Sequence, residues 1–286
     1  MANGVVGLKP TYGRVSRYGV LALAESLDHV GPMARRVADA AVVLQAIAGF
    51  DSKDPTSLKE PIPNMLEALR GGAEGVRIGI DRAYATEGVD PGLVAAIEAA
   101  LGVLERLGAR IVEVGMPDFP ASFMNAWFTI CAYEARVAHA ANYPARADAY
   151  GAYFRDLLEM GSKVTSEAYS EASALRAKFN EQFVATLSTV DAVVCPAAGV
   201  PFPISAETQY GNMAAFDKVI PNLQVQFTAP ADFAGTPTIS LPCGANKDGV
   251  PYTIQLLGGR LAEPTLCRIA HAYEAATEWR ARHPQV

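Results

Sequence analysis

The chain has 286 residues, of which 50% are hydrophobic and 19% are charged, and its formal net charge is −6. This composition is globular, and the negative charge disfavours a general nucleic-acid-binding role, which requires a basic surface. Residues 1–20 lack the apolar core of a signal peptide, and no apolar run reaches the roughly 18 residues that a membrane span needs. We therefore expect no nucleic-acid or membrane partner and a cytoplasmic location.

The first part of the chain predicts alternating strands and helices. Val5 and Val6 are expected to begin a short strand before a glycine-rich turn region. Apolar residues at helical spacing predict a helix over 37–48, and the proline-containing segment 51–63 is expected to be an exposed connection. Strands are then expected over 76–80 and 109–114, with a helix between them that Asp90 caps, so a parallel βαβ unit is favoured.

The second part is mostly helical up to residue 188 and then changes character. The clearest helix is expected within 165–187, and it leads into a buried strand that Pro196 ends. Residues 196–236 are rich in Pro, Gly and Asn and predict a long irregular stretch. The segments "TPTISLPCG" and "PYTIQLLGG" predict a β-hairpin with an Asp-Gly turn, followed by a last helix over about 262–282. The whole pattern indicates an α/β fold class.

No residue of the chain stands out as a catalytic nucleophile. Ser240 lies in the middle of an expected strand, and Ser162 is interpreted as part of a polar helix start. Lys9 precedes a proline in a glycine-rich turn, where a lysine with a lowered pKa can act as a base, although a contact that fixes the turn is the favoured interpretation.

The cysteines and histidines show no cofactor or metal pattern. The four cysteines are far apart in apolar surroundings and are expected to be buried free thiols: Cys131, Cys195, Cys243 and Cys267. The four histidines are equally scattered, and the glycine patterns of nucleotide-binding loops are missing. We expect no metal and no cofactor.

Several segments in order resemble the amidase signature family. They are "GVVGLKPTYGRVSRYGV", "SLDHVGPMARRVADAAVVLQAIAG", "TAPADFAGTPTISLPCG", "GVPYTIQLLGG" and "AEPTLCRIAHAYE", which together cover residue 4 to about 275. The resemblance implies a mixed β-sheet core flanked by helices, and hydrolysis of carboxylic amides by a serine nucleophile, a second serine in a cis peptide bond, and a lysine. It also implies a small-molecule amide as substrate.

In the family, the two serines and the lysine precede the segment that matches residues 4–11, and Lys9 matches a lysine that is not catalytic. We therefore expect 1–286 to be one α/β amidase-like domain that is N-terminally incomplete, without catalytic residues and inactive alone. An internal start of the sequence, a split enzyme completed by an upstream polypeptide, and a non-catalytic binding or scaffold paralogue are the three explanations. Exposed strand edges are expected to favour that upstream polypeptide or a homo-oligomer.

The resemblance leaves the substrate open. The opening motif is most similar to the glutamine-hydrolysing subunit of tRNA-dependent amidotransferases, but the acidic residue expected before the "TxPxxxxG" segment is missing from "NLQVQFTAP". A general amidase acting on a small or aryl-alkyl amide is therefore favoured. Arg176 lies near a basic position of that subfamily, although surface pairing explains it equally well.

The resemblance implies that the pocket walls come from the middle helical region and the long loop, so three residues at these positions are expected to bind the substrate: Trp127, Thr228 and Asp232. Each has a structural alternative. Trp127 suits a helix core, Thr228 a hydrogen bond within the loop, and Asp232 a helix cap.

Overall fold

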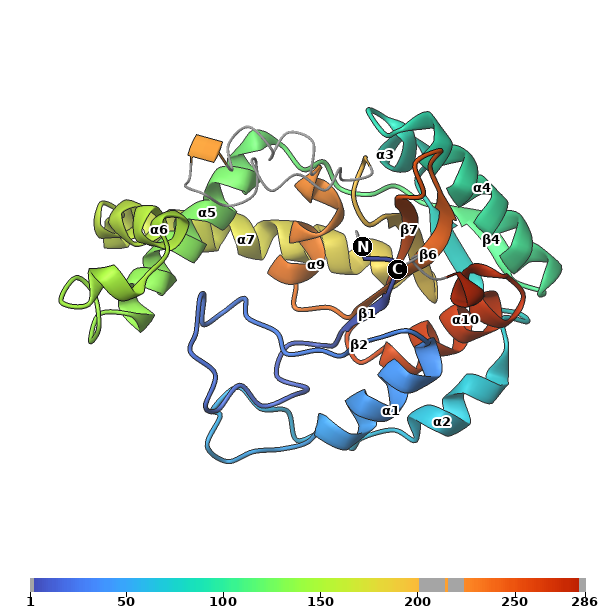
Figure 1. The fold of residues 1–286 in the computed structure, drawn as a ribbon, viewed down its shortest axis with the longest axis horizontal. Coiled ribbons are helices and arrows are strands. Elements are labelled where there is room, and N and C mark those ends of the chain that lie inside the picture. Colours follow the sequence, from blue (N-terminus) through green and yellow to red (C-terminus); the bar gives the residue numbers. More distant parts are fainter. Residues whose placement is uncertain (1–2, 201–213, 216–223, 283–286) are drawn as a thin grey trace.

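The computed structural model describes residues 3–200, 214–215 and 224–282 (Figure 1). The strands are β1 (Val6–Lys9), β2 (Met33–Ala34), β3 (Arg77–Ile80), β4 (Arg110–Glu113), β5 (Ala192–Pro196), β6 (Thr238–Ala245) and β7 (Pro251–Leu257). The helices are α1 (Val37–Ile47), α2 (Met65–Ala68), α3 (Arg82–Thr86), α4 (Pro91–Arg106), α5 (Ala121–Ala138), α6 (Ala152–Ser162), α7 (Ser166–Leu187), α9 (Ala229–Phe233) and α10 (Glu263–Ala275).

The strands of the described residues form one mixed sheet in the order β2-β1-β6-β7-β5-β3-β4. Strand β3 pairs in parallel with β4, as the βαβ pattern predicted, and also with β5, while the other pairs are antiparallel. The sheet confirms the α/β class. The first strand runs further than expected, since it includes Gly7 and Lys9 and pairs with both β2 and β6.

Local signals in the sequence explain where several elements begin and end. The Asp90 side chain accepts a hydrogen bond from the Leu93 amide at 3.0 Å and so caps α4, whose first residue is Pro91. Thr165 caps α7 in the same way. Gly249 adopts a φ of 80° in the turn between β6 and β7, a conformation that glycine enters without steric cost.

The helices divide into two groups around the sheet. Helices α4 and α10 both pack against β6, and α10 also contacts α1 and α2. Helices α5 and α6, with one end of α7, extend away from the sheet at the left of Figure 1. A large hydrophobic core joins the sheet to its helices, and a smaller one lies between α5 and α6. The sheet therefore supports a helical arm that is partly stabilised by its own core.

Three expectations need correction. The segment 51–63 is not simply an exposed connection, because Asp54 is only 5% exposed and binds the Arg17 amide. Ser162 is the last residue of α6 rather than a helix start. The long irregular stretch contains the helix α9 and a short 3₁₀ turn at Val225–Phe227, while residues 201–213 and 216–223 lie outside the described part.

None of the helices that the structure describes is long and apolar enough to cross a membrane.

Candidate functional site

The short helix α9 carries two of the three residues expected to bind substrate. Thr228 precedes the helix and Asp232 lies in its last turn, while Pro230 fits the first turn because its missing amide proton would have no partner there. The carbonyl of Phe233 accepts hydrogen bonds from Arg176 Nε and Asn180 Nδ2, each at 2.9 Å. Side chains of α7 therefore hold the end of α9 in place.

Asp232 is the meeting point of three segments that are distant in the sequence. Trp127 of α5 donates from Nε1 to Oδ2 of Asp232 at 3.2 Å, and Nδ1 of His29 lies 3.3 Å from Oδ1. The Asp232 side chain remains 26% exposed, whereas that of His29 is 4% exposed. The structure therefore brings Trp127 and Asp232 together as an indole beside a solvent-accessible carboxylate, and it adds a buried imidazole behind them.

Thr228 is connected to this group only through the backbone. Its carbonyl accepts a hydrogen bond from the Asp232 amide at 3.3 Å, and its exposed hydroxyl lies 3.5 Å from the Val225 carbonyl. This hydroxyl contact fits the structural alternative of a hydrogen bond within the loop. A role of Thr228 in binding stays a prediction.

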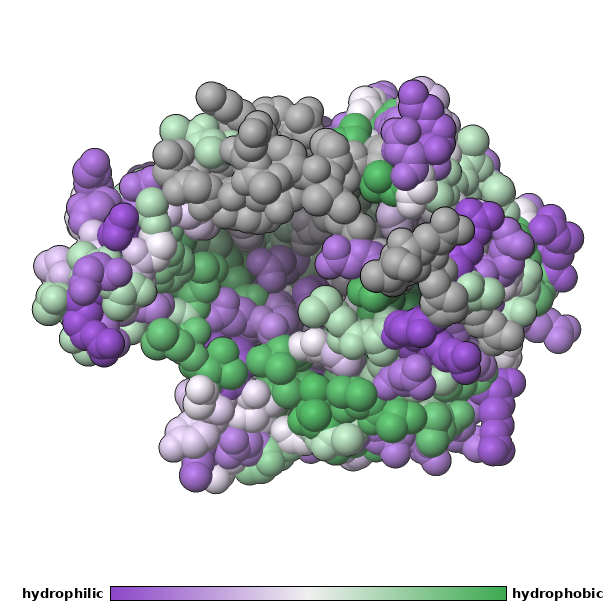
Figure 2. All heavy atoms as spheres, in the orientation of Figure 1, coloured by the Kyte–Doolittle hydropathy of each residue, from purple (hydrophilic) through white to green (hydrophobic). Residues whose placement is uncertain are grey.

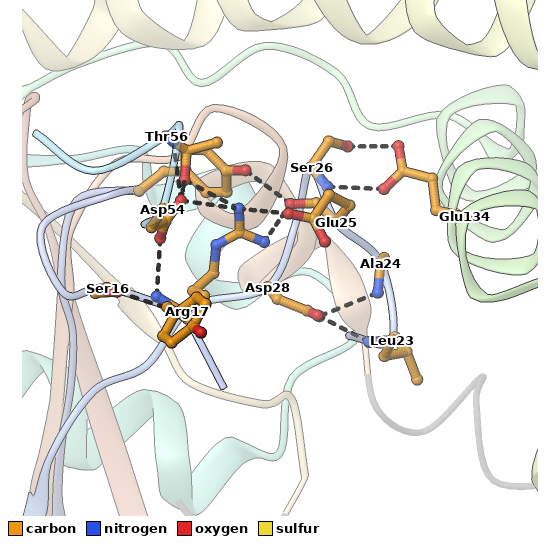
Figure 3. A network of polar contacts seen from close by, with 12 residues as sticks. Ser16, Arg17, Leu23, Ala24, Glu25, Ser26, Asp28, Asp54, Thr56 and Glu134 are labelled. Atoms are coloured by element: carbon orange, nitrogen blue, oxygen red, sulfur yellow. Dashed lines mark hydrogen bonds and ion pairs between the residues drawn. The ribbon is translucent and has the colours of Figure 1, made fainter. Parts of the chain in front are cut away.

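The segment before His29 is fixed by a carboxylate from α5, as Figure 3 shows. Glu134, only 7% exposed, accepts hydrogen bonds from the Ser26 amide at 2.7 Å and the Ser26 hydroxyl at 2.8 Å. Arg176 donates to the hydroxyl and to the carbonyl of Ser26, at 2.6 and 2.9 Å. Arg176 therefore joins α9 to this loop, and a simple surface pairing does not describe it.

A cavity of about 220 Å³ lies beside the same loop, and Arg17, Asp28 and Asp54 are among its lining residues. Arg17 is buried and donates to Glu25 and Thr56, as Figure 3 shows, which ties the two loops of the cavity wall together. Burial raises the pKa of Asp28, and the nearby Asp232 carboxylate raises it further. Asp232 is therefore close enough to the cavity to interact with the charge of a residue in its wall.

Lys9 lies close to this group but makes a structural contact. Its Nζ donates to the Thr236 carbonyl at 2.5 Å and to the Pro10 carbonyl at 3.3 Å, which supports the interpretation that it fixes the turn. Burial lowers the pKa of Lys9 to about 8, and the carboxylates of Asp232 and Glu263 partly oppose that effect. The lysine is thus a partly buried cation facing Asp232.

The four cysteines are buried and free, as the sequence predicted. Burial raises the pKa of Cys195 to about 12, which leaves its thiol protonated and unreactive near neutral pH. Within the described residues, no three or more His, Cys, Asp or Glu side chains are grouped so that they could hold a metal ion.

His29 was not predicted as a site residue from the sequence. It is a lone histidine without ligand spacing, and its partner Asp232 lies 203 positions further along the chain. The available signal was its place in "SLDHVGP", a segment that carried the family resemblance.

The model of the amidase family matches residues 1–267, so the chain belongs to the amidase family. A relative from Thermosynechococcus vestitus, named as a subunit of glutamyl-tRNA(Gln) amidotransferase, is 40% identical over 99% of this chain and 62% of its own length.

Solved structures agree with the sequence comparison. The peptide amidase PAM, in a complex with the inhibitor chymostatin, is 30% identical with a TM-score of 0.81, covering 100% of this chain and 61% of that one. The corresponding glutamyl-tRNA(Gln) amidotransferase subunit from Thermotoga maritima is also 30% identical, with a TM-score of 0.67 and coverage of 95% and 57%. The chain thus spans about three fifths of the length of these proteins.

Proposed function

We propose that this chain forms the substrate-binding part of an enzyme that hydrolyses carboxylic amides, and that small or aryl-alkyl amides are its substrates. The observation that carries the proposal is the Trp127 indole, which donates to the partly exposed Asp232 carboxylate. An aromatic surface beside a polar group of fixed orientation is typical of small-molecule sites. Thr228, one turn before Asp232, is included as a candidate at the edge of the pocket.

The family resemblance implies two catalytic serines and a catalytic lysine. We propose that these residues lie in a part of the enzyme outside these 286 residues. Two features support the assignment. Lys9 is held by two backbone carbonyls, and the hydroxyl of Ser26 lies between Glu134 and Arg176. We therefore expect this chain alone to bind an amide without hydrolysing it.

A glutamine-hydrolysing amidotransferase component is the second candidate, favoured by the 40% identity to a protein named as part of glutamyl-tRNA(Gln) amidotransferase. Two features of the chain oppose it. No carboxylate occupies Val225–Phe227, and three donors of Arg176 are already bound to Phe233 and Ser26. The two candidates differ in whether the ligand must carry charged amino and carboxylate groups.

The proposed function predicts that the chain binds phenylacetamide and does not bind L-glutamine comparably. The chain has two tryptophans, so in a Trp279→Phe background the fluorescence reports on Trp127 alone. We expect phenylacetamide to change this fluorescence with saturation, and Trp127→Ala to weaken binding about tenfold or more in calorimetry, because a buried aromatic contact is lost. Preferential binding of L-glutamine would support the second candidate, and no binding of either would refute the proposal.

Exposed apolar side chains form a belt on one face of the chain, made of Met33 and the exposed large side chains of α1, α2 and their flanks. This apolar belt supports the proposal that a partner covers the face. It consists of Met33, Val42, Val43, Ile47, Phe50, Ile62 and Leu66. Met33 is 78% exposed on the edge strand β2, and Figure 2 shows green side chains gathered over the lower face, where α1 lies. We propose that an additional amidase polypeptide or a second copy covers this belt.

The belt predicts self-association of the isolated chain. We expect light scattering during size-exclusion chromatography to show a mass above that of a monomer, and the double variant Met33→Lys/Val43→Lys to move it toward the monomer, because two charges then lie on the contact face. The matched control Val137→Lys changes an exposed valine of α5 outside the belt and should have no such effect. A monomeric wild-type chain would contradict the prediction.

A further inference from the structure

Side chains from two other segments contact the two carboxylate oxygens of Asp232. Nε1 of Trp127 donates to Oδ2, and Nδ1 of His29 faces Oδ1. Nδ1 of His29 also lies 2.6 Å from the Leu27 carbonyl, so two oxygen acceptors surround this one nitrogen. A carbonyl oxygen only accepts, so Nδ1 donates its proton to Leu27, and the imidazole lies against Asp232 with Nδ1 3.3 Å from Oδ1.

Two cations lie within electrostatic reach of Asp232. Burial lowers the pKa of Lys9 in β1 and of Arg176 in α7. The Asp232 carboxylate raises both pKa values and so partly offsets the effect of burial. The other carboxylate beside it is Asp28 of the preceding loop, which accepts hydrogen bonds from the Leu23 and Ala24 amides. Asp232 therefore has two cations within electrostatic reach, one indole donor on Oδ2 and an imidazole beside Oδ1.

The carboxylate still has capacity to accept another hydrogen bond. Each carboxylate oxygen has about two acceptor positions, Trp127 donates to one of those on Oδ2, and 26% of the side chain is open to solvent. A group that binds there must donate a proton, and the amide N–H of a neutral carboxamide does so. A carboxylate, which is the product of amide hydrolysis, would meet an anion of the same charge.

We propose that Asp232 accepts the N–H of the bound amide, so that the site selects neutral carboxamides with a free N–H and repels the carboxylate product. His29 is a positioning residue, since it acts through Asp232, whereas Trp127 both holds Asp232 and supplies the aromatic surface beside it. This inference rests on the proposed function and adds to it a rule for which ligands bind.

The test compares three probes of nearly the same shape: phenylacetamide, N,N-dimethylphenylacetamide and phenylacetate. We expect the wild-type chain to bind phenylacetamide at least tenfold more tightly than either of the others in calorimetry. Asp232→Asn should reduce that preference about tenfold or more and strengthen phenylacetate binding, because a hydrogen bond to a charged acceptor is lost together with the repulsion. Asp248→Asn, in the exposed turn between β6 and β7, is the matched control and should change nothing.

The role of His29 has a readout that needs no ligand. In NMR at constant pH, His29→Leu should shift the carboxyl-carbon signal of Asp232, because the imidazole nitrogen 3.3 Å from Oδ1 is lost. His29→Asn should stay near the wild type, since its amide nitrogen can replace Nδ1. An unchanged signal in His29→Leu would overturn the assignment of His29.

The outcomes separate the two proposals. If phenylacetamide binds and Asp232→Asn leaves the order of the three probes unchanged, the rule for Asp232 is wrong while the proposed function stands. If the wild-type chain binds none of the probes, the proposed function and the rule for Asp232 both fail, and the NMR signal of Asp232 still decides whether His29 holds this carboxylate.

Discussion

The stability of the chain is expected to rise with pH between about 8 and 10.5 through Lys9 alone. Burial lowers the pKa of this lysine to about 8 in the folded chain, against an ordinary value of 10.5. Within that window the unfolded chain binds a proton that the folded chain does not, so raising the pH favours folding. The difference corresponds to at most about 3 kcal/mol, present as a cost below pH 8 and absent above 10.5.

Other groups titrate in the same range with the opposite sign, so the measurement must be a difference. Burial raises the pKa of Cys195 and Cys243 to about 12. Above the ordinary pKa of a thiol, the unfolded chain loses these protons and the folded chain keeps them, so the chain becomes less stable as the pH rises. Urea unfolding from pH 7 to 10.5 should show the wild type gaining stability relative to Lys9→Met. Lys178→Met, on the exposed face of α7, provides the control, and a constant difference between wild type and Lys9→Met would contradict the prediction.

Elements whose cause is local could be predicted from the sequence. Asp90 and Pro91 predicted the start of α4, and the Asp248-Gly249 step predicted the hairpin of β6 and β7, because caps and turns depend on residues a few positions apart. The order of the sheet could not be obtained in this way. Strand β1 lies beside β6, more than 220 positions further along, and only the tertiary fold determines that pairing.

The site shows the same division. Trp127 and Asp232 were chosen through the family resemblance, and the structure places them in contact although 105 positions separate them. No local pattern indicates that distance, or that His29 would complete the group. Surface pairing, one of the two interpretations of Arg176, was wrong for a related reason. A helical wheel shows the face of α7 on which it lies, but does not show that a loop and α9 cover that face.

Arg176→Met is expected to cost about 3 kcal/mol of unfolding free energy and to weaken amide binding. The guanidinium donates to Phe233 and Ser26 and lies over the Phe233 ring at 5.6 Å, so its removal detaches both the α9 end and the loop before His29. It also removes a cation that interacts with the buried Glu134, and removal of one partner from a buried charged group is strongly destabilising. Arg176→Lys keeps the charge without the planar set of donors, so its unfolding free energy and its amide affinity should lie between those of the wild type and Arg176→Met.

A matched arginine separates the loss of stability from the loss of binding. Arg268 of α10 also donates to backbone carbonyls, at Gly72 and Glu74, but it does not contact α9 or the loop before His29. Arg268→Met should therefore destabilise the chain in urea unfolding and leave phenylacetamide affinity unchanged, while Arg176→Met changes both. If the two variants lost the same stability and both kept full affinity, Arg176 would serve the fold alone, and the position of Asp232 would depend on Trp127 and His29.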